Sequence, residues 1–134
     1  MMRFLTQLSL VLAISPDQAN HNGNYPYADG PKGAFRVTTT PVTTFKPNDW
    51  GLYNMHGNVW QWCSDWFGPY AISDDPLAVP VCDPAGPETG TIKIVRGGSW
   101  CDTPVFCRSA ARVTTPPDHK KIHIGFRIVA ELAK

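Results

Sequence analysis

Proline and glycine interrupt this chain so often that it cannot fold into a protein of long helices. Thirteen prolines and eleven glycines are distributed over 134 residues, and almost no stretch of helical length lacks both. Proline in a helix interior removes a hydrogen bond, and glycine there costs conformational entropy. Five tryptophans supply large rings for a core with little regular structure. We therefore expect one loop-rich globular domain with short elements.

The charge balance argues against two classes of partner. Lysine and arginine number 12 and aspartate and glutamate 11, which leaves a formal net charge of +1. A near-neutral chain has no general attraction to nucleic acid or to an anionic membrane surface. The 43% share of hydrophobic residues also argues against a strongly charged disordered chain. We therefore expect a folded domain with no nucleic-acid partner.

Residues 1–16 form a segment of their own. Arg3 precedes a run of about ten mostly apolar residues, which is the length of a signal-peptide core and too short for a membrane span of about 20 residues. The alternative is a strand or fragment end that packs on the fold. A secreted and a cytoplasmic location both stay open. Residues 17–134 are assigned to one domain, and no segment is expected to span a membrane.

Short β-branched and aromatic stretches predict the regular elements. Trp60 and Trp62 lie two residues apart, so they would share one face of a strand. Ile92 and Ile94 predict a half-buried strand by the same alternation. The expected extended segments are Val37–Thr40, Val42–Thr44, Val59–Ser64, Thr91–Val95, Cys107–Arg112 and Ile122–Val129, and the expected long loops are Asp17–Lys32 and Gly68–Gly90.

Four segments in series identify a family. They are Gly51–Cys63 (GLYNMHGNVWQWC), Val95–Trp100 (VRGGSW), Cys107–Arg112 (CRSAAR) and Ile124–Arg127 (IGFR). In this order and at this spacing they resemble the formylglycine-generating enzyme, or sulfatase-modifying factor, family. The resemblance implies an α+β, C-type-lectin-like fold, loop-rich and with short strands. Because the match looks like only the C-terminal half of the family's domain, we expect a fold truncated at its N-terminal side.

The resemblance also implies a chemistry that depends on two cysteines. In the formylglycine-generating branch, two thiolates bind one copper(I) ion, and the enzyme oxidises a cysteine of a client sulfatase to formylglycine. Cys101 and Cys107 follow the same Gly-Gly-Ser motif here but are spaced differently from the family pair. Ser99 matches an active-site serine of the family. These three residues are the candidate catalytic groups, although the spacing predicts that copper does not bind and leaves enzymatic activity open.

The cysteines also have a simpler interpretation. The chain has four of them, and no two have the C-x-x-C spacing of a zinc or redox motif. An even number permits two disulfides in any of three pairings. Free, buried thiols are the alternative, because cysteine often behaves as a small apolar residue.

A calcium site is the second cofactor expectation that follows from the resemblance. The family binds calcium beside this tryptophan-rich segment, and the corresponding positions are the Asn54 side chain, the Gly57 and Val59 carbonyls, and Gln61. The family has glutamate at the last position. A neutral amide oxygen still binds calcium, but the loss of a carboxylate lowers the affinity.

A binding module is the alternative to an enzyme. The C-terminal pattern also resembles the variable region of the target proteins of diversity-generating retroelements, which bind ligands through exposed positions between fixed motifs. The candidate ligand-binding residues are Trp100, Asp102, Thr103, Phe106, Val113, Thr114 and His119. Six of these residues fall in two expected loops, Cys101–Phe106 and Val113–Lys121, and loops held at both ends by a scaffold are where binding residues usually lie. A protein or peptide is the expected ligand, and a truncated, inactive remnant is the third interpretation.

Two further expectations concern the scaffold and the oligomeric state. Arg96, Arg108, Arg112 and Arg127 lie in apolar segments, so they are expected to pair with carboxylates or carbonyls. A domain that lacks its other half would expose apolar faces, and such faces promote association. A homo-oligomer is therefore expected.

Overall fold

One small sheet is the main regular structure of the protein. The computed structural model describes residues 14–70, 82, 84 and 86–130. The elements within them are the strands β1 (Trp60–Trp66), β2 (Lys93–Arg96), β3 (Val113–Thr115) and β4 (Ile124–Gly125), and the 3-10 helices η1 (Val42–Thr44) and η2 (Pro104–Cys107). Neither of these helices is long and apolar enough to cross a membrane. Turns and loops make up the rest of the described chain, as its proline and glycine content predicts.

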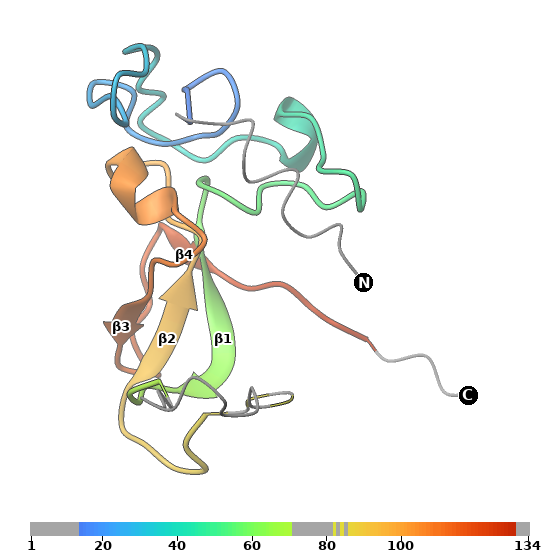
Figure 1. The fold of residues 1–134 in the computed structure, drawn as a ribbon, viewed down its shortest axis with the longest axis vertical. Coiled ribbons are helices and arrows are strands. Elements are labelled where there is room, and N and C mark those ends of the chain that lie inside the picture. Colours follow the sequence, from blue (N-terminus) through green and yellow to red (C-terminus); the bar gives the residue numbers. More distant parts are fainter. Residues whose placement is uncertain (1–13, 71–81, 83, 85, 131–134) are drawn as a thin grey trace, which may run out of the picture.

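The strands pair in the order β3-β2-β1-β4 (Figure 1). β1 and β2 are antiparallel, with Gln61 opposite Arg96 and Trp62 opposite Val95. The register then shifts before Trp66, as at a β-bulge. β3 is antiparallel to β2, whereas β4 pairs in parallel with the start of β1. The sheet therefore brings the tryptophan-rich segment between the Gly-Gly-Ser strand and the C-terminal strand.

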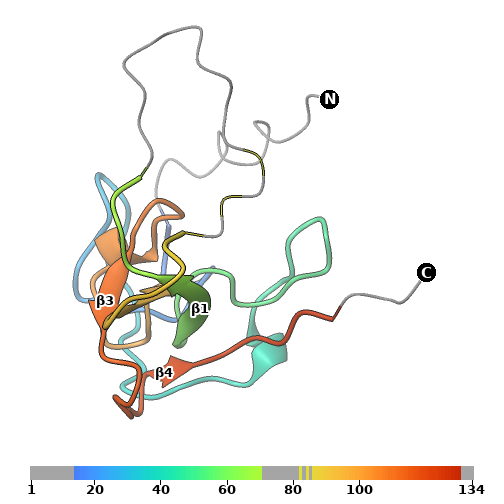
Figure 2. The same cartoon turned by 90° about the horizontal axis from the view of Figure 1, so that it is seen from below.

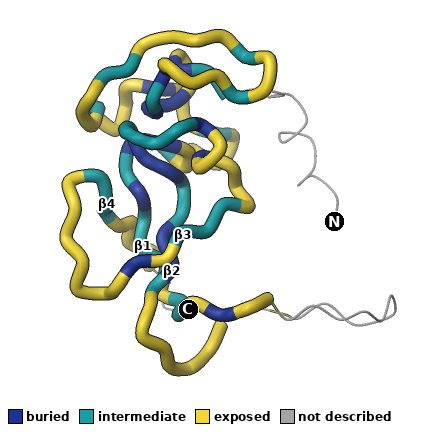
Figure 3. The backbone as a smooth tube through the Cα atoms, turned by 90° about the vertical axis from the view of Figure 1, so that its left-hand side faces the viewer, coloured by how far each residue is buried: buried dark blue, intermediate teal, exposed yellow. Residues whose placement is uncertain are grey.

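Loops from the first half of the described chain lie over one end of this sheet, at the top of Figure 1. The Gly57 N–H donates to the Gly97 carbonyl at 2.7 Å, and the Asn58 N–H donates to the Asn20 carbonyl at 2.7 Å. The Trp100 N–H donates in turn to the Asn58 carbonyl at 3.0 Å. Figure 3 shows buried positions gathered where these loops meet the strands. Main-chain hydrogen bonds therefore fix the loops on the sheet.

The interior contains polar side chains beside apolar ones. The buried residues include Ala19, Phe45, Trp60, Ile94, Val95 and Cys107 among the apolar ones and Asn20, His21, Asn58, Ser99 and Thr115 among the polar ones. Asn58 shows how one of these polar side chains is satisfied. Its Oδ1 accepts from Asn20 Nδ2 at 3.1 Å and from the Thr40 N–H at 2.9 Å, and its Nδ2 donates to the Thr40 carbonyl at 3.1 Å. Hydrogen bonds thus supply part of the cohesion that a larger apolar core would supply.

Two of the expected strands are present. The strand expected at Val59–Ser64 is β1, and the one expected at Thr91–Val95 is β2, each displaced by a residue or two. Trp60 is buried and Trp62 half-buried. Ile94 is buried as expected, but Ile92 precedes β2 and is exposed, so the expected alternation begins one residue too early.

The other four expected extended segments were wrong in whole or in part. Val37–Thr40 forms no strand, and Val37 has a φ of 61°, outside the extended region. Val42–Thr44 is η1, because a turn closes from the Thr44 N–H to the Pro41 carbonyl at 3.1 Å. Cys107–Arg112 is not a strand: η2 ends at Cys107, and a turn closes from Ala111 to Arg108. Pro104, whose fixed φ suits a helix start, begins η2.

The C-terminal segment is less regular than its apolar pattern suggests. Of Ile122–Val129, only Ile124–Gly125 pairs in the sheet. Beyond this point the chain leaves the body of the molecule (Figure 2). Arg127, two residues past this pairing, is hydrogen bonded through its side chain to the loop before β1. The signal-like stretch lies outside the described residues as far as Ala13.

Candidate functional site

Ser99 and Asp102 meet Trp60 at the turn that follows β2. Ser99 is fully buried, and its hydroxyl donates a short hydrogen bond to Asp102 Oδ2. The indole Nε1 of Trp60 donates to the same oxygen at 2.7 Å. The Asp102 N–H donates back to the Ser99 carbonyl at 3.2 Å. One carboxylate oxygen therefore accepts hydrogen bonds from two buried donors. Through these bonds, the half-buried Asp102 connects the turn to β1.

The candidate catalytic cysteines have different surroundings. Cys101 is half-buried, and its Sγ lies 3.3 Å from Ser99 Oγ. Cys107 is 2% exposed. A Cβ on Gly98 would lie 2.7 Å from Cys107 Sγ, so the thiol packs here only because residue 98 is glycine. Both cysteines are free thiols, as is Cys63, so the disulfide alternative does not hold for these three.

Burial controls the chemistry of Cys107. Desolvation raises the pKa of its thiol to about 12, the negative charge of Asp102 adds to the rise, and a hydrogen bond from the Gly57 main chain opposes it. The thiolate is the form of cysteine that acts as nucleophile and metal ligand. A neutral thiol packed against Gly98 does not fit a copper(I) ligand. Among the described residues, no three His, Cys, Asp or Glu side chains are placed to hold a metal ion.

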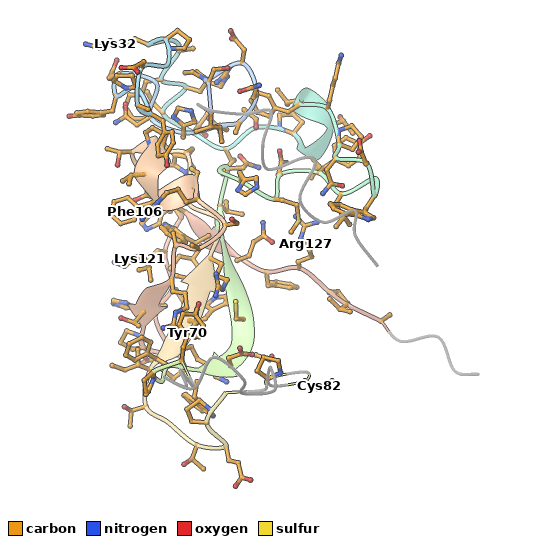
Figure 4. The ribbon with its side chains drawn as sticks, in the orientation of Figure 1. Lys32, Tyr70, Cys82, Phe106, Lys121 and Arg127 are labelled. Carbon is orange, nitrogen blue, oxygen red and sulfur yellow. The ribbon has the colours of Figure 1, made fainter. Side chains whose placement is uncertain are left out.

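The structure brings four of the seven candidate ligand-binding residues together around η2. Trp100 stacks on Phe35 with ring centroids 6.3 Å apart. Phe106 meets Trp60 edge to face at 6.2 Å and is 42% exposed, at the outer side of η2 in Figure 4. Thr103 is half-buried beside them. The Asp102 carboxylate accepts the hydrogen bonds from Ser99 and Trp60. We call Trp100, Thr103 and Phe106 the η2 surface.

The other three candidate residues lie elsewhere on the sheet. Val113 and Thr114 belong to β3, so the loop expected at Val113–Lys121 begins as a strand. His119 follows β3, and its Nδ1 lies 3.1 Å from Thr115 Oγ1. Figure 1 shows β3 further along the sheet from η2. The structure therefore does not gather all seven residues around η2.

The four calcium-site positions surround the loop before β1. Gln61 Nε2 donates to the Asn54 carbonyl at 3.0 Å, and Gln61 Oε1 accepts from Arg127 Nε at 2.9 Å. Asn54 and Gly57 both have positive φ, at 50° and 78°. Val59 is half-buried beside them. Because both polar atoms of the Gln61 amide already bind protein groups and the set has no carboxylate, these residues do not fit a calcium ion as they are arranged.

The arginines behave as expected from the sequence. Each donates to main-chain carbonyls: Arg96 to Ser109 and Ala111, Arg108 to Val105, Arg112 to Gly68 and Arg127 to Tyr53. Arg112 also lies over the ring of Tyr70, 3.8 Å from its centroid. The bonds of Arg96, Arg112 and Arg127 connect separate segments of the sequence, whereas the Arg108 bond is local, to the residue three positions earlier. Arg96, Arg112 and Arg127 therefore fix the scaffold around the site.

Asn58 is the residue that sequence reasoning missed. It lies inside the matched motif, between Gly57 and Val59, two of the expected calcium positions. Its φ of 68° places it in the left-handed region, which asparagine enters more readily than most residues. The Gly57-Asn58 dipeptide was therefore the available signal for a tight turn.

Comparison with known proteins gives consistent matches. The family model "Sulfatase-modifying factor enzyme 1-like domain" matches residues 11–132. The formylglycine-generating enzyme of Thermomonospora curvata is 40% identical over 112 residues, which are 81% of this chain and 36% of that protein. The chain thus spans about a third of the length of this curated relative.

Solved structures show the same architecture. The Treponema denticola variable protein 1 superposes with a TM-score of 0.65 at 28% identity, covering 82% of this chain and 34% of that one. PvdO from Pseudomonas aeruginosa superposes with a TM-score of 0.59 at 32% identity, covering 82% of this chain and 38% of that one. The loop-rich, C-type-lectin-like fold expected from the sequence is confirmed.

Proposed function

The chain belongs to the sulfatase-modifying factor family, and on that premise we propose that it is a ligand-binding domain of formylglycine-generating type that works without a copper pair. The relation to the oxidase is one of family and fold. The ligand we propose is a protein or peptide, bound at the η2 surface. Oxidation of a client cysteine is the activity that this proposal excludes for the chain as it stands.

The state of Cys107 carries the proposal. Copper(I) prefers soft thiolate ligands. Burial raises the pKa of the Cys107 thiol to about 12, and the thiol packs against Gly98. Cys101, the other member of the pair, has Ser99 as its neighbour. A copper ion would have to displace a proton and open this packing before it gained a second ligand.

The η2 surface is suited to binding because its base is rigid. The Ser99 and Trp60 bonds to Asp102 fix the turn beneath it, and the Trp100 ring is fixed by its stack on Phe35. A rigid base lowers the entropy lost when a ligand binds. The half-exposed Phe106 ring offers an apolar contact, and aromatic side chains are enriched where proteins bind one another.

Copper binding and turnover provide the first test. The protein is titrated anaerobically with copper(I) against a chromogenic chelator, and a peptide that carries the sulfatase cysteine motif is assayed for formylglycine by mass spectrometry. We expect the chelator to keep the copper and the peptide to stay unmodified. Tight copper binding that disappears in Cys107→Ser, or conversion of the peptide, would overturn the proposal.

Peptide binding provides the second test. The same sulfatase-motif peptide, fluorescently labelled, and a displayed random-peptide library are the probes. We expect Phe106→Ala to weaken capture of any bound peptide about tenfold, the order of one aromatic contact at an interface. Tyr25→Ala, at an exposed ring in the loop of residues 14–36, is the matched control and should leave capture unchanged. Equal weakening by both variants, or no capture of any peptide, contradicts a binding site at η2.

A ligand-binding variable protein of a diversity-generating retroelement is the second candidate function. The likeness to the Treponema denticola variable protein 1 favours it, because that structure superposes over 82% of this chain. The genomic neighbourhood decides this question. A near-copy of the segment that encodes residues 95–127, next to a reverse transcriptase gene, supports this candidate, and the absence of such a copy contradicts it.

A further inference from the structure

A chain of hydrogen bonds connects the C-terminal segment to the loop before β1. Arg127 donates through Nη2 to the Tyr53 carbonyl at 2.7 Å and through Nε to Gln61 Oε1 at 2.9 Å. Figure 4 shows Arg127 beside the start of β1, on the side of the loops that precede the strand. Gln61 Nε2 then donates to the Asn54 carbonyl at 3.0 Å. Two side chains therefore join the C-terminal segment to β1 and to the loop just before that strand.

The network extends to η1. Asn54 Nδ2 donates to the Val42 carbonyl at 3.2 Å, so the Asn54 side chain is also committed to a protein partner. Asn54 has a φ of 50°, in the left-handed region. The two bonds at Asn54, one to its carbonyl and one from its side chain, hold this turn in place.

Arg127 determines which way the Gln61 amide faces. A guanidinium has only donors, so the amide must present its oxygen to Arg127. The amide nitrogen then necessarily points at the loop and donates to the Asn54 carbonyl. An N–H donor of Gln61 therefore faces the loop that contains Asn54 and Gly57, the other positions expected to bind calcium, and an amide turned the other way would place two donors against each other.

We propose that Gln61 and Arg127 form a metal-free clip, which holds the loop before β1 as a bound cation would and makes the fold independent of calcium. The clip needs a neutral amide at position 61, because only an amide supplies an oxygen for Arg127 and a donor for Asn54 at once. The inference concerns the scaffold and does not depend on the proposed ligand.

A single substitution distinguishes a clip from a metal site. In Gln61→Glu, one carboxylate oxygen still accepts from Arg127, but the other faces the Asn54 carbonyl, so two acceptors oppose each other. A divalent cation relieves that repulsion, and carboxylate and carbonyl oxygens are the ligands calcium prefers. Gln61→Met is the matched control, because it keeps the length of the side chain and has neither oxygen nor donor.

The experiment measures melting temperatures of the full chain by circular dichroism in chelator, in millimolar calcium and in millimolar magnesium. We expect the unsubstituted protein to melt at one temperature in all three. Gln61→Glu should melt lower in chelator and recover in calcium more than in magnesium, and Gln61→Met should melt lower without recovery. Two results would overturn the proposal. One is a saturable rise of the melting temperature of the unsubstituted protein with calcium, and the other is a melting temperature of Gln61→Glu that does not change with calcium.

A second variant covers the case in which Gln61→Glu does not fold in chelator. Arg127→Ala removes the donor that orients the amide, so the amide is free to turn its oxygen toward the loop. We expect this variant to melt lower than the unsubstituted protein and to gain a calcium response that the unsubstituted protein lacks. Loss of stability without any calcium response would show that Arg127 does not set the direction of the amide.

Discussion

The indole of Trp60 donates a hydrogen bond to Asp102 across 42 positions of sequence, from the start of β1 to the turn after β2. The acceptor oxygen, Asp102 Oδ2, also accepts a hydrogen bond from the Ser99 hydroxyl. Trp60 is 4% exposed and Ser99 is fully buried, so neither donor has water as an alternative partner. The bond therefore fixes the base of the η2 surface.

Removal of the Asp102 carboxylate should destabilise the fold. Asp102→Ala leaves the Ser99 hydroxyl and the Trp60 indole without an acceptor, and each such buried donor costs about 1–3 kcal/mol. We expect the free energy of unfolding, measured in urea, to fall by about 2 kcal/mol or more. Asp118→Ala, at an exposed position, is the control and should change it by less than about 0.5 kcal/mol. Equal effects of the two substitutions would contradict a structural role for Asp102.

Asn58 should be sensitive to substitution for two separable reasons. Asn58→Ala removes the side-chain bonds to Asn20 and Thr40 and leaves a Cβ at a φ of 68°. Asn58→Gly removes the same bonds but relieves the backbone cost, which is roughly 1 kcal/mol. We expect both variants to unfold at lower urea concentration, with the alanine variant the less stable. A glycine variant as stable as the unsubstituted protein would show that the amide bonds contribute nothing.

Stability should decline in alkaline solution because of Cys107. The unfolded thiol loses its proton near its ordinary pKa of 9.0, whereas burial raises the pKa in the folded state to about 12. The unfolded state therefore releases a proton first, and the free energy of unfolding falls as pH rises from 9 toward 12, by at most about 1.4 kcal/mol per pH unit. Cys107→Ala should flatten this dependence, as measured by melting temperature between pH 8 and about pH 10.5. Burial also raises the pKa of Cys63, so Cys63→Ala serves as the comparison. A profile equally steep in Cys107→Ala would assign the loss to another group.

Self-association should follow from the exposed C-terminal segment. Ile122, Phe126, Ile128 and Val129 are between 75% and 85% exposed, and Figure 2 shows this segment extending from the body of the molecule. Apolar groups gathered on a surface favour association. We expect a dimer or higher oligomer by light scattering after size exclusion, shifted toward monomer by Ile128→Asp. Tyr25→Asp is the control at an exposed ring elsewhere, and a monodisperse monomer before any substitution would refute the expectation.

The pattern of residues predicted much of the scaffold. Turn-forming residues limited the elements to short ones, and alternating apolar residues located β1 and β2 to within about two residues. Arginines in apolar segments predicted carbonyl partners, and all four have them. Each of these expectations depends on local conformation or on the chemistry of one side chain, which a sequence displays directly.

The partners of the site residues could not be predicted from the sequence in the same way. The sequence predicts Asp102 as a ligand-binding residue in a loop, yet its carboxylate accepts hydrogen bonds from Trp60 and Ser99. The sequence predicts a loop at Val113 and Thr114, yet pairing with β2 makes them part of β3. In both cases the deciding partner lies on another segment, so no property of the loop itself contained the answer.

The sequence alone determined the family, the loop-rich fold and the residue types available to a site. The tertiary structure decided which of those residues are free to act. The sequence shows that residue 61 has an amide, but only in the folded chain does Arg127, 66 residues away, direct the amide nitrogen toward Asn54. The sequence shows that residue 107 has a thiol, but only burial against Gly98 in the folded chain raises its pKa to about 12. The physical reason is the same in both cases: hydrogen-bond direction and desolvation depend on neighbours that the chain brings together only when it folds.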